Sequence, residues 1–123
     1  MKSKIKYWIP AILYMAFLFY LSSRPAPEEL KWIPTIAELK LVHIIEYGIL
    51  YFLVWYAVIK TTSYNKLEAF TLALMVTILY GLTDEFHQIF VVGRTARLED
   101  VAADVVGCIL TQAGISISNN YRH

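Results

Sequence analysis

The sequence predicts an all-α fold, a small polytopic membrane bundle of four transmembrane helices with both termini in the cytoplasm. The first observation behind this prediction is composition, since 58% of the 123 residues are hydrophobic and only 17% are charged. A soluble domain of this size has a large surface for its volume and needs more polar residues to cover it. The second observation is that four apolar runs are each long enough for a helix that crosses most of a bilayer. The length predicts a single domain over residues 1–123.

Charge and cysteine usage exclude several classes of protein. The formal net charge is +1 and no basic cluster stands out, so the chain lacks the electrostatics of a nucleic-acid-binding protein. Cys108 is the single cysteine, which rules out a disulfide framework and a cysteine-based metal site. We interpret it as a small packing residue.

The first helix is predicted over residues of about 5–23, where basic residues precede an uncharged run. The seventeen residues of that run, 7–23, would span about 26 Å as a helix. A cleaved signal peptide begins with the same pattern, but the run is longer than a usual signal core and further apolar runs follow. We therefore expect an uncleaved helix, with Pro10 in its first turns, where a missing N–H matters least.

The other three helices are predicted over residues of about 39–60, 67–91 and 98–118. Pro25 and Pro27 end the first helix, because two prolines in three residues cannot continue it. A short polar turn follows the second helix, and Gly93 is the expected turn residue after the third.

The third apolar run contains the acidic and polar segment Asp84-Glu85-Phe86-His87-Gln88. Burying carboxylates in such a run is expensive in a protein core and in a bilayer alike. Asp84, His87 and Gln88 are three or four residues apart, so they share one helix face while Phe86 turns away. This segment needs either partner groups or a water-filled site.

Four helices in alternating directions bring the polar residues to one end of the bundle. That end comprises the end of the first helix, the start of the second, the end of the third and the start of the fourth. We expect a polar pocket there, with candidate acid/base residues Asp84, Glu85, His87 and His43 and candidate ligand-binding residues Lys40, Glu46, Tyr47, Gln88, Arg94, Asp100, Asp104, Ser22 and Arg24. The basic residues near both chain termini lie on the opposite face, which the positive-inside rule assigns to the cytoplasm. The pocket is therefore expected in the outer leaflet.

The polar cluster has more than one interpretation. His87, with the neighbouring carboxylates of Asp84 and Glu85, could act as a general acid or base. The same groups could instead lock the helices together, with Arg94, Arg97 or Lys40 pairing the acids. Histidine and carboxylate ligands for zinc or manganese are present, but no spacing among them is diagnostic of a metal site. We therefore expect no cofactor and keep a divalent metal as the alternative.

The polar motifs and their order resemble the VanZ-like family. The motifs are Lys40-x-x-His43-x-x-x-Tyr47, Asp84-Glu85-x-His87-Gln88 and Gly93-Arg94-x-x-x-x-x-Asp100, with Ser22-Ser23 before them and Gly107 after them. The resemblance implies a small multi-helix membrane protein of the bacterial envelope, whose founding relatives confer low-level resistance to the glycopeptide teicoplanin. This chain has Val92 where the family often has proline, and Asp104 where it often has asparagine.

Three functions follow as hypotheses for a multi-pass protein of the bacterial cytoplasmic membrane. In the first, the outer pocket binds an anionic lipid-linked cell-wall precursor or a glycopeptide and contributes to teicoplanin-type resistance. The basic residues would hold such an anion. In the second, the protein is a hydrolase or transferase that acts on a phosphorylated lipid through Asp84, Glu85 and His87. In the third, it is a structural or partner-binding subunit. The expected partners besides that ligand are the lipids of the bilayer, and nucleic acid is excluded.

Overall fold

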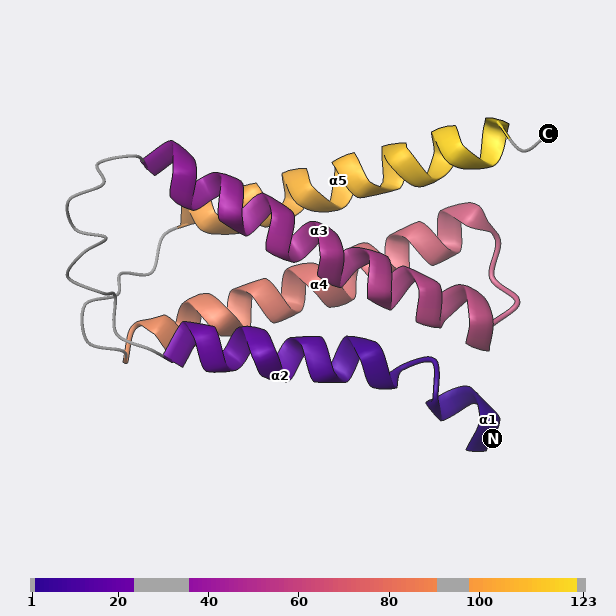
Figure 1. Ribbon diagram of the computed structural model, residues 1–123, viewed down its shortest axis with the longest axis horizontal. Coiled ribbons are helices and arrows are strands. Elements are labelled where there is room, and N and C mark those ends of the chain that lie inside the picture. The colour runs from indigo at the N-terminus through magenta and orange to yellow at the C-terminus, as the bar shows by residue number, and fades with distance from the viewer. Residues whose placement is uncertain (1, 24–35, 91–97, 122–123) are drawn as a thin grey trace.

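A computed structural model describes residues 2–23, 36–90 and 98–121, with the side chains of 4–21, 43–90 and 101–118. The elements in chain order are α1 (Lys2–Ile5), α2 (Ile9–Ser23), α3 (Ile36–Thr61), α4 (Lys66–Gln88) and α5 (Leu98–Tyr121) (Figure 1). Within these ranges the regular structure is entirely helical. The predicted all-α bundle is confirmed.

The four longer helices alternate in direction, as Figure 1 shows. The C-terminal ends of α2 and α4 therefore lie at the same end of the bundle as the N-terminal ends of α3 and α5, and we call this the polar end. The other end, with the start of α2, the end of α3, the start of α4 and the end of α5, is the terminal end. The arrangement brings together the helix ends that carry the acidic and histidine residues.

The helix predicted over 5–23 is interrupted near its start. Pro10 has no N–H, and its ring clashes with a helical carbonyl four residues earlier, at Lys6. The backbone tightens there: Tyr7 N donates to Lys4 O at 3.2 Å and Trp8 N to Ile5 O at 2.9 Å. The result is the short α1 and a 15-residue α2. The prediction of one continuous first helix is therefore wrong.

The remaining helices begin and end within three residues of the predicted bounds. A capping box fixes the start of α4, because Asn65 Oδ1 accepts from Glu68 N at 2.8 Å while Asn65 N donates to Glu68 Oε1 at 3.1 Å. This pairing satisfies backbone donors that the first turn of a helix leaves without partners.

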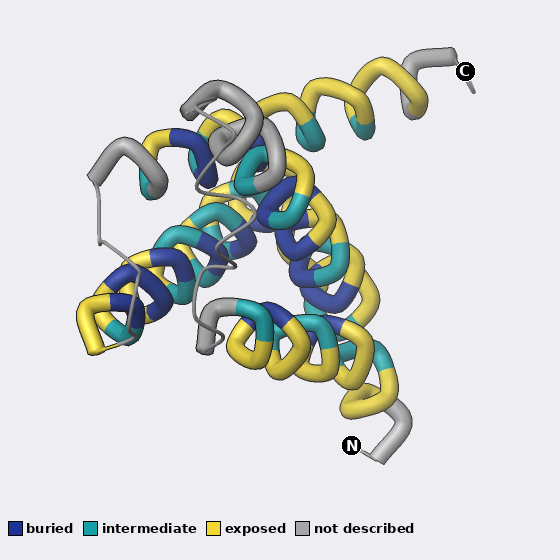
Figure 2. Tube along the Cα trace, turned by 60° about the vertical axis from the view of Figure 1, so that its left-hand side comes forward, coloured by how far each residue is buried: buried dark blue, intermediate teal, exposed yellow. Residues whose placement is uncertain are grey.

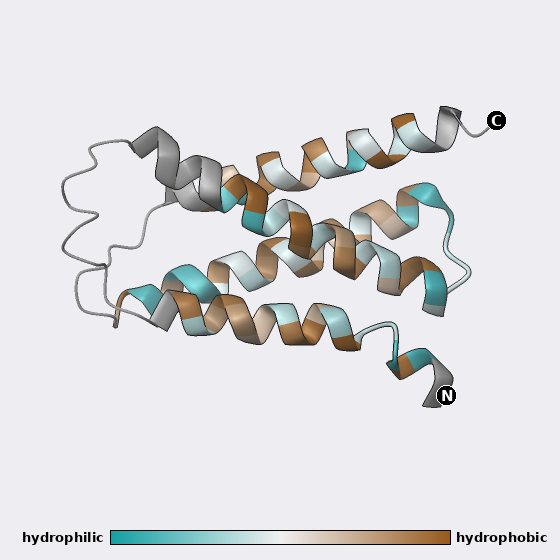
Figure 3. Cartoon of the chain, viewed as in Figure 1, coloured by the Kyte–Doolittle hydropathy of each residue, from teal (hydrophilic) through white to brown (hydrophobic). Residues whose placement is uncertain are grey.

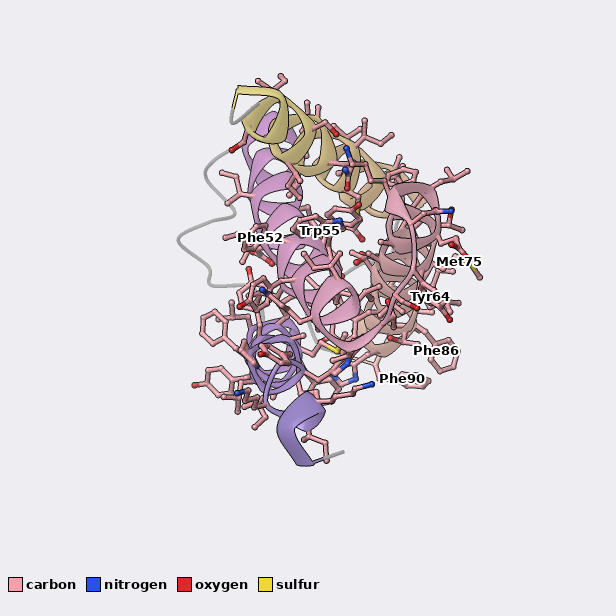
Figure 4. The ribbon with its side chains drawn as sticks, turned by 90° about the vertical axis from the view of Figure 1, so that its right-hand side faces the viewer. Phe52, Trp55, Tyr64, Met75, Phe86 and Phe90 are labelled. Atoms are coloured by element: carbon pink, nitrogen blue, oxygen red, sulfur yellow. The ribbon has the colours of Figure 1, made fainter. Side chains whose placement is uncertain are left out.

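Three helices are long and apolar enough to cross a membrane, over His43–Thr61, Lys66–Gln88 and Val101–Ser118. The apolar part of α2, Ile9–Leu21, is shorter. Hydrophobic residues cover much of the helix middles, and hydrophilic ones gather toward the ends (Figure 3). Large apolar side chains on the outer faces, including the labelled Met75, Phe86 and Phe90, point away from the bundle (Figure 4). Such a surface suits lipid rather than water.

The core lies on α3, whose buried residues face α4 and α5 (Figure 2). Two glycines let α3 and α5 approach closely. A Cβ on Gly107 would lie 2.4 Å from the backbone oxygen of Ile44, and one on Gly48 would lie 2.8 Å from Thr111 Oγ1. Thr111 Oγ1 in turn donates to the carbonyl oxygen of Gly107 at 2.8 Å. Small residues at a helix crossing are typical of packing in membranes, where close van der Waals contact drives association.

Candidate functional site

Two side chains of α3 form the centre of the polar end. His43 and Tyr47 are four residues apart, so they lie on the same face one turn from each other. Their rings stack nearly parallel, with centroids 5.9 Å apart and an interplanar angle of 8°. Each ring then reaches a carboxylate on a different neighbouring helix.

Tyr47 links α3 to α4. Its hydroxyl donates to Asp84 Oδ2 at 2.9 Å, and both residues are buried. The second oxygen, Asp84 Oδ1, is buried and has no hydrogen-bond partner among the side chains and backbone that the structure describes. Hydrogen bonds that involve a charged group contribute about 1.5–3 kcal/mol each. The tyrosine therefore makes the burial of Asp84 partly tolerable, and one carboxylate oxygen still lacks a donor.

His43 links α3 to α5 through Asp104. His43 Nδ1 lies 3.2 Å from Asp104 Oδ1, and the two side chains are 17% and 1% exposed. A histidine whose Nδ1–H is held by a carboxylate has a fixed tautomer and a fixed ring orientation. The pair could therefore present the histidine in a single orientation to a ligand.

Gly81 on α4 provides the space that Asp104 occupies. A Cβ at Gly81 would lie 2.5 Å from Asp104 Oδ2 and 3.6 Å from Tyr47 Cε1. Sequence reasoning missed this residue. A signal was present, since a glycine inside a helix costs about 1 kcal/mol relative to alanine and often has a packing reason.

The last two turns of α4 divide their side chains among three directions. Asp84, Glu85 and Gln88 are buried, whereas Phe86 is 65% exposed and points outward (Figure 4). The ring of His87 faces α2 and stacks on Phe19, with centroids 4.4 Å apart. The predicted outward turn of Phe86 is confirmed. Both histidine rings stack on an aromatic ring, and His43 in addition contacts the carboxylate of Asp104.

Tyrosines join α2 to the same cluster through backbone carbonyls. Tyr14 OH donates to the carbonyl oxygen of Glu46 at 3.0 Å, and Tyr80 OH donates to that of Met15. The side chain of Glu46 is half-buried. These tyrosines, like Phe19, are site neighbours that sequence reasoning missed, because aromatic residues are also common at bilayer interfaces and in helix packing.

The structure describes the other predicted site residues only in part or not at all. Ser22, Lys40 and Asp100 lie on α2, α3 and α5 at the polar end, but their side chains are outside the described set. Arg24, Arg94 and Arg97 fall outside the described residues altogether. Among the described side chains, no three histidine, cysteine or acidic residues lie close enough to hold a metal ion.

An open groove of about 400 Å³ runs between α3 and α5. Its lining is almost wholly apolar and consists of Ile44, Ile45, Gly48, Ile49, Phe52, Gly107, Leu110 and Thr111. Ile44 follows His43 directly, and Gly107 lies three residues after Asp104. The His43–Asp104 pair therefore stands at the polar end of this groove, between the same two helices.

The family model described as VanZ/LLP1 matches the chain over residues 7–118. The chain belongs to the VanZ/LLP1 family. The match includes α2, α3 and α4, most of α5 and the whole polar end. No curated protein and no solved structure matches the chain. Together with its apolar helices, VanZ/LLP1 membership identifies a membrane protein.

Proposed function

We propose that this VanZ/LLP1 protein lies in the bacterial cytoplasmic membrane and binds an anionic ligand at its polar end. That ligand is a lipid-linked cell-wall precursor or a glycopeptide, and its binding contributes to teicoplanin-type resistance. The polar end lies in the outer leaflet and both termini lie in the cytoplasm, as the distribution of basic residues favours.

The observation that carries this proposal is the cluster of His43, Tyr47, Asp84 and Asp104 from three helices. Ionisable residues within membrane segments are expensive and by default mark a functional site. This cluster is held by two specific cross-helix contacts, and the His43 side chain is 17% exposed, which favours a binding site. Lys40, Arg24 and Arg94 belong to the same end in the sequence and supply the positive charge for an anion.

The test is drug susceptibility in a bacterium that expresses the protein. We expect the minimal inhibitory concentration of teicoplanin to rise several-fold with the wild-type protein and to fall back with His43→Gln or Asp84→Asn. Lys60→Gln at the terminal end is the matched control, because it also replaces an ionisable side chain near a helix end with an amide. Full resistance in both polar-end variants, at normal membrane levels, would contradict the proposal.

The His43–Asp104 pair favours a second candidate, a hydrolase or transferase that acts on a phosphorylated lipid. A carboxylate that orients a histidine is a recurring device of general acid/base catalysis. We favour His43 over His87 for this role, because Asp104 holds the Nδ1 atom of His43. Turnover would be measured as phosphate release from a lipid phosphate in detergent. His43→Gln should abolish it and His87→Gln should preserve most of it.

The same variants test the purely structural alternative. If the protein is only a helix lock, each substitution that lowers resistance should lower the unfolding free energy in proportion. Loss of resistance in a variant of normal stability would count against the lock.

A further inference from the structure

We propose that the groove between α3 and α5 holds the hydrocarbon chain of the ligand, which is therefore a lipid-linked anion rather than a water-soluble glycopeptide. This inference rests on the proposed function and narrows it to one class of ligand. It is carried by the shape, the lining and the position of the groove relative to the His43–Asp104 pair.

The groove is a built feature of the α3–α5 crossing. Gly48 and Gly107 are buried and form its base, while Ile45, Ile49 and Leu110 are exposed along its rim. The absence of two Cβ atoms at the base keeps the helix axes close, since a Cβ on either glycine would meet the opposite helix within 3 Å. The long side chains around the base then form the walls of an open groove.

The dimensions of the groove suit one chain. From Ile44 to Phe52 the lining covers eight helical steps, about 12 Å, which is most of the roughly 15 Å depth of one leaflet. Spread over that length, the volume of about 400 Å³ gives a section of roughly 33 Å². A helix about 10 Å wide has a section of roughly 80 Å². A hydrocarbon chain therefore fits along the groove, whereas a helix of a second copy could enter it only with its side chains.

Among the described residues, the groove meets ionisable side chains at its polar end. Along its length the lining is apolar apart from Thr111, whose hydroxyl is already bonded to the backbone carbonyls of Gly48 and Gly107. Beyond Ile44 the next side chain toward the polar end is His43, held by Asp104. A molecule with a chain in the groove would thus carry its head group to the polar end. This sequence of apolar and polar surface matches an amphiphile.

Photo-labelling of the full-length protein in nanodiscs tests the inference. The probe is hexadecyl phosphate with a diazirine at the chain end, and adducts are mapped by mass spectrometry. We expect most adducts on the groove residues, and at least a five-fold loss of them with Leu110→Trp or with Ile45→Trp, which fill the groove. Leu79→Trp on the outer face of α4 is the matched control, since Leu79 is also an exposed leucine of a long helix. It should leave groove labelling unchanged.

The outcomes separate the groove from the anion site. Labels spread evenly over α4 and the groove, or equal losses with Leu110→Trp and Leu79→Trp, would overturn the groove. A dimer that Leu110→Trp and Ile45→Trp dissociate would overturn it too, because the occupant would be a second copy. Equal groove labelling by the phosphate and by the matching diazirine hexadecanol would instead contradict the anion binding of the proposed function. Circular dichroism and gel filtration confirm that each variant is folded before labelling.

Discussion

The polar end and the terminal end of the bundle handle their polar groups in opposite ways. At the polar end, buried Asp84 and Asp104 are tied to Tyr47 and His43 across helix boundaries. At the terminal end, polar groups are neutral or exposed, and most are satisfied within a turn, as in the capping box at Asn65. Lysines there lie over aromatic rings, for example Lys60 Nζ at 5.6 Å from the ring centre of Tyr56.

The difference shows at which end of the bundle the fold buries ionisable groups, at a cost in folding free energy. Helices can be joined at lower cost by neutral contacts, as in the hydrogen bond from Trp8 Nε1 to Thr61 Oγ1 at 3.3 Å. Removing one partner of a buried polar pair leaves the other uncompensated and destabilises the protein. A bundle that only needed to hold together would have no reason to concentrate acids at one end. The asymmetry therefore supports function at the polar end, and the predictions below test it from the largest expected effect on stability to the smallest.

The largest effect on stability is expected from replacing Gly107 of α5 with alanine, and the same substitution at Gly114 is its control. Gly107→Ala would put a Cβ 2.4 Å from the backbone oxygen of Ile44, which cannot move without shifting α3. We expect a loss of about 3 kcal/mol of unfolding free energy, measured by denaturant titration in detergent. Gly114→Ala, toward the terminal end, has nothing within 4 Å and should stabilise by up to about 1 kcal/mol through helix propensity. Equal effects at both sites would show that the α3–α5 crossing does not depend on Gly107.

The next effect is expected from Tyr47→Phe, which removes the hydroxyl bonded to Asp84. Neither oxygen of the buried Asp84 carboxylate would then have a hydrogen-bond donor among the described residues. We therefore expect a loss of about 2 kcal/mol of unfolding free energy. Tyr64→Phe is the control, because Tyr64 is exposed at the terminal end, and it should change stability by less than about 0.5 kcal/mol. The double variant Tyr47→Phe, Asp84→Leu should recover part of the loss. No recovery would mean that the loss does not arise from leaving the Asp84 carboxylate without this donor.

A local effect is expected at the terminal end from Asn65→Ala. The side chain that accepts from Glu68 N is lost, which should cost about 1 kcal/mol. Asn65→Asp keeps an acceptor and should restore the stability. Neither variant should change teicoplanin susceptibility when membrane levels are equal. A susceptibility change with Asn65→Asp would show that the terminal end also takes part in function.

The sequence alone predicted the helices and the end at which the polar residues meet, for clear physical reasons. Apolar runs of membrane-spanning length must be helical, and alternating directions decide which helix ends are neighbours. The individual pairs could not be predicted. Whether His43 reaches Asp104 or Asp84 depends on how α3 and α5 are rotated at their glycine crossing. That rotation is a property of packing, which helical periodicity does not reveal.

The start of the first long helix and the packing of His87 show the same limit. Pro10 lies in the first turn of a helix, as expected, but this helix is α2, which begins at Ile9 rather than at about residue 5. The stacking of the His87 ring on Phe19 could not be predicted, because it depends on how α2 packs against α4.

The smallest effect on stability, and the sharpest separation of the two candidate functions, is expected from Asp104→Asn. Asparagine keeps an oxygen that accepts from His43 Nδ1 and has almost the same shape, so the unfolding free energy should change by about 0.5 kcal/mol. It is also the residue that the family resemblance leads us to expect at this position. Binding of an anionic lipid should survive, because the loss of a negative charge does not weaken attraction for an anion. General acid/base catalysis should fall at least ten-fold, because the carboxylate that stabilises a charged imidazole is gone. Phosphate release and teicoplanin susceptibility, measured on this variant, separate the two functions. Retained resistance without phosphate release is expected if the protein only binds its ligand. Parallel loss of both in a stable variant would favour the enzyme.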